Sequence, residues 1–127
     1  MNQPVSALME RRVWSVDMDD SVAEVERLFA DQNLSWAPVL EARRTILGVI
    51  AASDLLQFHA HGRDPVATRA WQLCTYKPVM VGPQTPLGEV ARQMIERKIH
   101  HVVVVEGDSV AGVVSSLDFV RTFVEAA

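Results

Sequence analysis

Two stretches of this sequence repeat one pattern: Gly48–Asp54 reads GVIAASD and Gly112–Asp118 reads GVVSSLD. Each stretch opens with a glycine and two branched apolar residues, and each closes on an aspartate. They lie 64 positions apart, and upstream of them Val16 aligns with Val81 at a shift of 65. A shift that is maintained along the chain with a single gap indicates an internal repeat.

The two copies are expected at residues 1–62 and 63–127. Each should form strand, helix, strand, strand and helix, after a short lead-in helix. The expected elements of the first copy are 5–9, 13–16, 22–32 (capped by Asp20 or Ser21), 36–40, 45–51 and 53–60. Those of the second copy are 66–73, 79–81, 87–98, 101–105, 109–115 and 116–124. Because a copy of about 60 residues buries little surface alone, we expect an α+β fold of two β-α-β-β-α repeats, packed sheet to sheet with pseudo-two-fold symmetry.

Composition narrows the class of protein. The 127 residues are 49% hydrophobic and 22% charged, with a formal net charge of −4, which is typical of a globular acidic chain. No run of Lys or Arg predicts nucleic-acid binding, and no apolar run is long enough for a membrane span. A single cysteine, Cys74, and a start without signal-peptide features favour a cytoplasmic protein. No P-loop, metal-ligand cluster or nucleophile–base pair indicates an enzyme.

The repeated stretch resembles the signature of the CBS domain, which is a Gly, two apolar residues, Thr or Ser, two further residues and Asp. The second copy matches it fully through Gly112, Ser115 and Asp118, whereas the first has Ala51 in place of the hydroxyl residue. The chain as a whole therefore resembles a tandem CBS pair, also called a Bateman module. The resemblance implies a regulatory module without catalytic chemistry of its own.

The resemblance also implies an adenine nucleotide in the cleft between paired domains, with the Asp on the ribose hydroxyls and the Thr or Ser beside ribose and phosphate. The segment around His100 resembles a phosphate-contacting segment of the AMP-activated kinase gamma subunit, and Thr75 resembles part of a Thr-Tyr pair near the adenine. From the residues themselves, cationic side chains could reach phosphate and valines could hold the adenine face. The candidate ligand-binding residues are Arg12, Val13, Asp54, Thr75, Lys77, Val79, Val81, His100, His101, Ser115 and Asp118; no metal ligand is expected.

Several interpretations stay open at this point. Asp54 and Asp118 could serve only as helix caps, and the Ala51 departure predicts a weak or empty first site. The ligand could be AMP, ADP, ATP or S-adenosylmethionine, bound as a regulatory ligand and not as a required cofactor. The chain could instead be a ligand-free scaffold for dimerisation or partner docking. We expect a homodimer through the apolar face of the closing helices, such as Phe119, Val120, Phe123 and Val124, and a regulated protein that the sequence does not identify.

Overall fold

The computed structural model describes residues 1–76 and 78–126. The chain forms two compact units, each described here by itself. The first unit is Trp14–Pro78, and the second unit combines Met1–Val13 with Val79–Ala127. The compact units therefore differ from the two contiguous repeats. The lead-in segment of each repeat belongs to the unit that contains the helices of the other repeat.

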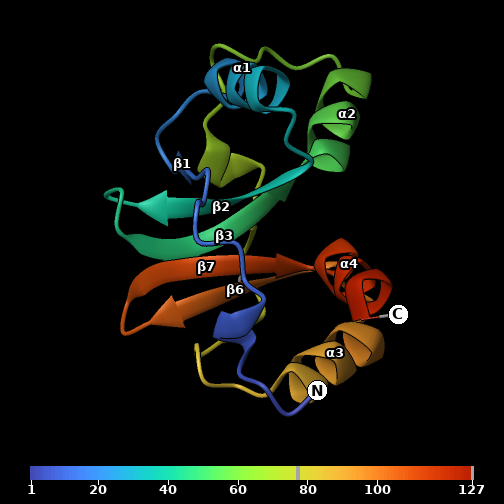
Figure 1. Cartoon of the computed structure of the whole chain (residues 1–127). Coiled ribbons are helices and arrows are strands. Elements are labelled where there is room, and N and C mark those ends of the chain that lie inside the picture. Colours follow the sequence, from blue (N-terminus) through green and yellow to red (C-terminus); the bar gives the residue numbers. More distant parts are fainter. Residues whose placement is uncertain (77, 127) are drawn as a thin grey trace. The chain divides into compact units, whose positions relative to one another are not determined.

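The first unit has a four-stranded sheet in the order β1-β2-β3-β4, with both helices on one face (Figure 1). Strands β1 and β2 are parallel, and the other neighbours are antiparallel. Its elements are β1 (Val16–Asp17), α1 (Val22–Gln32), β2 (Trp36–Glu41), β3 (Thr45–Ala51), α2 (Ala52–Ala60), the 3₁₀ turn η2 (Ala70–Gln72) and β4 (Thr75–Tyr76). Strand β4 is an element that the sequence did not predict.

The second unit repeats this arrangement with a three-stranded sheet in the order β5-β6-β7. Its elements are the 3₁₀ turn η1 (Val5–Ala7), β5 (Met80–Val81), α3 (Leu87–Arg97), β6 (His101–Glu106), β7 (Ser109–Ser115) and α4 (Ser116–Ala126). The order of elements expected for each repeat is confirmed. The first strands are shorter than expected, since β1 begins at Val16 and not at Val13, and β5 begins at Met80 and not at Val79.

Capping residues fix both ends of helix α1. Of the two predicted caps the structure uses Ser21, whose Oγ accepts a hydrogen bond from the Glu24 backbone N–H at 3.1 Å. The Glu24 carboxylate accepts in return from the Ser21 N–H at 3.1 Å, which completes a capping box and holds the pKa of Glu24 below its ordinary value. The helix ends at Asn33 in the left-handed conformation, with φ of 53°.

Each unit encloses its own apolar core, and each core receives residues from the other repeat's lead-in segment. Val5 and Met9 pack in the second unit, whereas Ala70 and Cys74 pack in the first. The remaining core of the first unit is Val16, Val22, Val25, Phe29, Ala37, Val39, Ile50, Leu55 and Phe58. The remaining core of the second unit is Val81, Leu87, Val90, Met94, Val102, Val104, Val114 and Phe119.

The lead-in segments form single 3₁₀ turns and not the helices that the sequence predicts. The chain must extend directly afterwards, because Thr75 pairs with Val49 of β3 and Glu10 forms the equivalent bridge to Val113 of β7. The N-terminal lead-in also serves α3, which has no side-chain cap at Pro86. The N–H groups of Leu87 and Gly88 donate to the Gln3 and Met1 carbonyls at 2.8 and 2.9 Å. The backbone of the lead-in thus satisfies donors that a helix start leaves open.

One expectation about the closing helices is wrong. Phe119, which the sequence places on an exposed apolar face, is 6% exposed and belongs to the core of the second unit. Its position on α4 points toward the sheet, as the equivalent Leu55 does on α2. Val120, Phe123 and Val124 are exposed as expected. Within the part of the chain that the structure describes, no helix is long and apolar enough to cross a membrane.

Candidate ligand-binding site

The predicted residues of the second repeat gather where β6 starts and β7 runs into α4. His101 and Ser115 are direct partners in the antiparallel ladder, so their side chains lie on the same face of the sheet. The Ser116 N–H donates to the His100 carbonyl at 3.0 Å, which ties the start of α4 to the start of β6. We call His100, His101, Ser115, Ser116 and Asp118 the β7–α4 corner.

Asp118 is held by the backbone of this corner. Its Oδ2 accepts from the Ser115 N–H at 2.8 Å, and the Asp118 N–H donates to Ser115 Oγ at 3.3 Å. Its Oδ1 lies 4.0 Å from Nη1 of Arg121, and the Asp118 side chain is 22% exposed. The carboxylate is therefore fixed in direction while part of its surface stays accessible, and as an ionised group it can only accept hydrogen bonds.

The surroundings of His101 in this corner change the pKa of its ring. Partial burial lowers the pKa of His101 below its ordinary value, and the adjacent His100 lowers it further. The Asp118 carboxylate acts on the pKa in the opposite direction without cancelling the effect of burial. At neutral pH the His101 ring is thus uncharged, and it presents one donor and one acceptor. His100 precedes the strand and is exposed.

The first unit has the same backbone geometry with different side chains. Asp54 Oδ2 accepts from the Ala51 N–H at 2.8 Å, and the Ala52 N–H donates to the Ser35 carbonyl at 2.9 Å. The ladder partner of Ala51 is Trp36, so this corner carries neither the hydroxyl nor the imidazole of the second unit. The aspartate bond and the helix-start bond are repeated at both corners, whereas the bond from the Asp118 N–H to Ser115 Oγ has no equivalent at Ala51.

The other predicted residues are divided between the units. Arg12, Val13 and Val79 lie in the second unit with the β7–α4 corner, and Thr75 lies in the first. Val81 is 7% exposed and packs in the core of its unit, which accounts for its apolar character without a ligand. Lys77 lies outside the described residues. The candidate list from the sequence omitted Ser116, whose N–H bond to the His100 carbonyl depends on the strand register and has no sequence signal.

Among residues 1–76 and 78–126, no group of three or more His, Cys, Asp or Glu side chains is arranged to hold a metal ion. The family model that matches the sequence is the CBS domain, and it matches twice, at residues 5–61 and 70–125. The chain belongs to the CBS-domain family. Its two compact units each carry the sheet and the helix pair of one CBS domain.

Curated relatives match this CBS pair over only part of their own length. An uncharacterized protein of Methanocaldococcus jannaschii is 22% identical over 95% of this chain, which spans 43% of that protein. The inosine-5'-monophosphate dehydrogenase of Korarchaeum cryptofilum is 30% identical over 85% of this chain, which spans 22% of that enzyme. The chain therefore covers less than half the length of the curated relatives that it matches.

Solved structures share the fold of the whole chain. A CBS domain pair in complex with 5'-methylthioadenosine and S-adenosyl-L-methionine has a TM-score of 0.88, with 20% identity and 100% coverage of both chains. CBSX2 in complex with AMP has a TM-score of 0.84, with 23% identity and 98% coverage of both chains. The CBS domain of a bacterial CNNM/CorC family Mg²⁺ transporter in complex with ATP has a TM-score of 0.86, with 22% identity, and covers 96% of this chain and 87% of that one.

The glycine that opens each CBS signature has a structural reason. A Cβ on Gly48 would lie 2.4 Å from the Thr75 carbonyl oxygen, because β4 passes directly alongside. A Cβ on Gly112 would lie 2.8 Å from Met9 Sδ and 2.9 Å from the Glu10 carbonyl oxygen. Each glycine thus allows the lead-in segment of the other repeat to approach the strand that carries the glycine, β3 or β7.

Gly48→Ala is expected to lower the free energy of unfolding by about 1–3 kcal/mol, because the added methyl group meets a backbone carbonyl. Denaturant unfolding followed by circular dichroism measures this loss. Gly82→Ala is a suitable control for a change outside the sheet, since the nearest atom to its added Cβ, Thr85 Oγ1, lies 4.0 Å away. An unfolding free energy for Gly48→Ala equal to that of the unmodified protein would contradict the packing explanation.

Proposed function

We propose that this CBS pair is a regulatory module that binds an adenosine-containing ligand at the β7–α4 corner of the second unit. The observation that carries the proposal is the placement of a fixed, partly exposed carboxylate at Asp118 beside the Ser115 hydroxyl and the His101 ring. The known structures with this fold in complex with AMP, with ATP, and with 5'-methylthioadenosine and S-adenosyl-L-methionine support the choice of ligand class.

Asp118 is suited to the ribose of such a ligand. The two hydroxyl groups of the diol are donors, and an ionised carboxylate accepts both through charge-assisted hydrogen bonds. The Ser115 N–H bond keeps Oδ2 in place, so the ligand need not order the side chain when it binds. Ser115 and the His101 ring lie on the same face beside this carboxylate, and we propose that they face the groups attached to the 5' end of the ribose.

We expect one good site in each chain. In the first unit, Ala51 and Trp36 replace the hydroxyl and imidazole of the second unit, and Asp54 keeps only the bond that the backbone requires. Arg12, Val13 and Val79 remain proposed ligand contacts in the second unit, and Thr75 and Lys77 remain proposed ligand contacts on the evidence of the sequence alone. The proposal assigns these residues to holding and orienting a ligand, and it assigns none of them a role in turnover.

Binding is proposed to act as a signal and not as a step of catalysis. The ligand would change how two copies of the chain pair, and a regulated protein in the cytoplasm would respond to that change. A ligand-free scaffold for dimerisation or docking is the second candidate, and the exposed apolar side chains of α4 favour it. The two candidates differ in one respect: only the first requires stabilisation by an adenosine compound.

A thermal-shift panel separates these candidates. AMP, ADP, ATP, 5'-methylthioadenosine and S-adenosylmethionine are each added to the protein, with GMP as the control for the base. A ligand present at 100 times its dissociation constant stabilises the folded chain by about 2.7 kcal/mol. For a chain of this size that corresponds to a rise in melting temperature of about 10 °C. No rise with any adenosine compound at millimolar concentration would reject the proposal in favour of the scaffold.

The affinity for AMP is expected to increase as the pH falls below about 7. His101 is neutral in the free protein because burial lowers its pKa below 6.5, whereas a neighbouring phosphate raises the pKa. Binding therefore takes up a proton between the two pKa values, and the dissociation constant falls by at most about tenfold for each pH unit in that window. Below the pKa of the free protein the dependence on this group ends.

Calorimetric titration with AMP from pH 8 to pH 6.5, above the second pKa of the phosphate at about 6, measures this dependence. His101→Gln should flatten the profile, and 5'-methylthioadenosine, which has no phosphate, should give a flat profile with the unmodified protein. An AMP affinity that is constant over this range would show that the phosphate does not lie beside His101.

A further inference from the structure

A basic side chain of α4 lies beside the Asp118 carboxylate. Arg121 Nη1 is 4.0 Å from Asp118 Oδ1, one turn along the helix, and the Arg121 side chain is 67% exposed. Asp118 Oδ2 is already engaged, because it accepts from the Ser115 N–H at 2.8 Å. Arg121 therefore lies beside the carboxylate oxygen that this backbone bond does not use.

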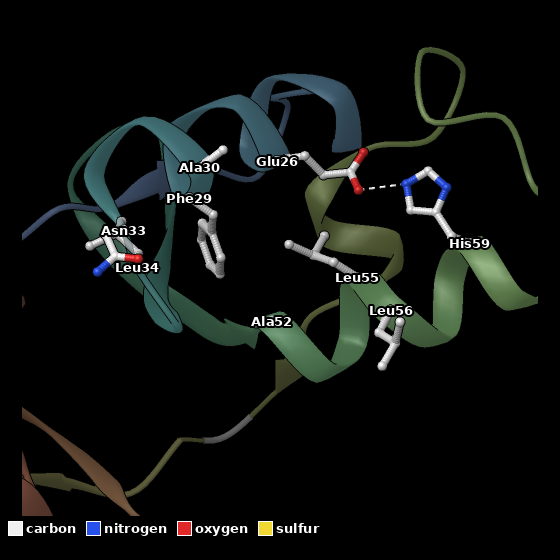
Figure 2. Close-up of a pocket in the computed structure, with 9 residues that line it drawn as sticks. All are labelled: Glu26, Phe29, Ala30, Asn33, Leu34, Ala52, Leu55, Leu56 and His59. Carbon is white, nitrogen blue, oxygen red and sulfur yellow. Dashed lines mark hydrogen bonds and ion pairs between the residues drawn. The ribbon is translucent and has the colours of Figure 1, made fainter.

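The equivalent position of the first unit carries an uncharged side chain. The repeat aligns Arg121 with Gln57 of α2. The next titratable side chain on α2 is His59, and Figure 2 shows it directed toward α1, where its Nε2 contacts Glu26 Oε2 at 2.5 Å. The second unit thus differs from the first in this basic residue as well as in its hydroxyl and imidazole groups.

We propose that Arg121 determines how strongly the β7–α4 corner prefers an adenosine ligand that carries a phosphate at its 5' end. The proposal rests on the adenosine site of the proposed function and adds the residue that responds to the charge of the ligand. As the ribose hydroxyls bind Asp118, the guanidinium turns from Oδ1 to the phosphate. An exposed ion pair at 4.0 Å contributes little to stability, so this movement opposes binding only weakly.

The diol and the 5' phosphate belong to one ribose unit, so the guanidinium has only a short distance to cover. Arg121 has a long side chain with staggered rotamers to choose from, and most of its surface is exposed. A change of rotamer therefore moves the guanidinium without any movement of the helix.

The charges of the corner favour this role. A phosphate near the Asp118 carboxylate brings two negative groups together, which opposes binding unless a cation lies beside them. The His101 ring is uncharged at neutral pH, because burial lowers its pKa, and it offers the phosphate one donor. The Arg121 guanidinium stays charged and presents a planar fork of N–H donors, which suits bidentate binding of phosphate. Adenosine, which has no phosphate, gains nothing from this cation.

Calorimetric titration of Arg121→Gln with AMP and with adenosine tests the role, because these ligands differ only in the 5' phosphate. The substitution gives α4 the residue type that α2 has at Gln57. Arg121→Lys keeps the charge without the planar fork. Arg92→Gln is the matched control, because Arg92 also belongs to an exposed ion pair within one helix, with Nη1 3.4 Å from Glu96 Oε1 of α3.

Arg121→Gln should weaken AMP binding at least about tenfold and change adenosine binding by less than about twofold. Arg121→Lys should retain most of the affinity for AMP, and Arg92→Gln should bind both ligands as the unmodified protein does. Equal changes for AMP and adenosine in Arg121→Gln, or no change for either, would overturn the proposal while the adenosine site stands. If the unmodified protein binds neither ligand, the adenosine site and the role of Arg121 are both rejected.

Discussion

Deletion of residues 1–10 is expected to unfold the second unit, although those residues belong to the first repeat. Val5 is fully buried and Met9 is 8% exposed in the core of the second unit. The deletion also removes the carbonyls that accept from the start of α3 and the bridge from Glu10 to Val113. Met9→Ala alone should cost about 2–5 kcal/mol. The sum of these losses is comparable with the total stability of a domain, about 5–15 kcal/mol.

Native-state amide exchange measures this effect one residue at a time. In the deletion variant the amides of Val102, Val103 and Val104 should lose their protection, while those of β2 in the first unit keep most of theirs. Ala7→Ser is the matched control, because Ala7 is exposed within the same segment and its replacement should change stability by less than about 0.5 kcal/mol. Full protection of the β6 amides after the deletion would contradict the packing of the N-terminal lead-in segment in the second unit.

Asp118→Ala and Asp54→Ala are expected to cost the same stability and to differ at least about 100-fold in adenosine binding. Each aspartate accepts at 2.8 Å from the N–H three residues before it, so each substitution removes one cap worth about 1 kcal/mol. Only Asp118 is proposed to hold the ribose, through two charge-assisted hydrogen bonds worth about 1.5–3 kcal/mol each.

Calorimetric titration of the two variants with the best ligand of the thermal-shift panel measures the difference in binding, and denaturant unfolding confirms that the structural costs match. Asp54→Ala thus controls for the helix cap. Equal loss of affinity in both variants would show that binding depends on stability or on both CBS domains. Retention of affinity in Asp118→Ala would remove the ribose contact from the proposal.

Local chemistry was enough to predict most elements from the sequence. The ranges of α1, β3 and β7 are those expected, because capping residues, apolar periodicity and turns fix them within a few positions. The exchange of lead-in segments could not be predicted, since Val5 and Ala70 occupy equivalent positions in the repeat. From the sequence, each lead-in segment could pack in the core of its own repeat or in that of the other repeat. No residue pattern distinguishes these two arrangements.

Only the part of the candidate site that depends on local sequence could be predicted. The motif places Ser115 and Asp118 at a strand end and a helix start, and the structure joins them by two hydrogen bonds. The pairing of His101 with Ser115 depends on the ladder register, and the lowered pKa of His101 depends on burial, which sequence spacing does not specify. Val81 and Phe119 illustrate the same limit, because an apolar residue near a site can belong to the core.

Amide chemical shifts in the presence of AMP test the central proposal most directly. Titration of the labelled protein should move the resonances of Ser115, Ser116 and Asp118, together with the imidazole signals of His101, and should move those of the equivalent residues 51–54 much less. A spectrum unchanged at millimolar AMP and at millimolar concentrations of the other adenosine compounds of the panel, or changes confined to the first unit, would contradict an adenosine site at the β7–α4 corner.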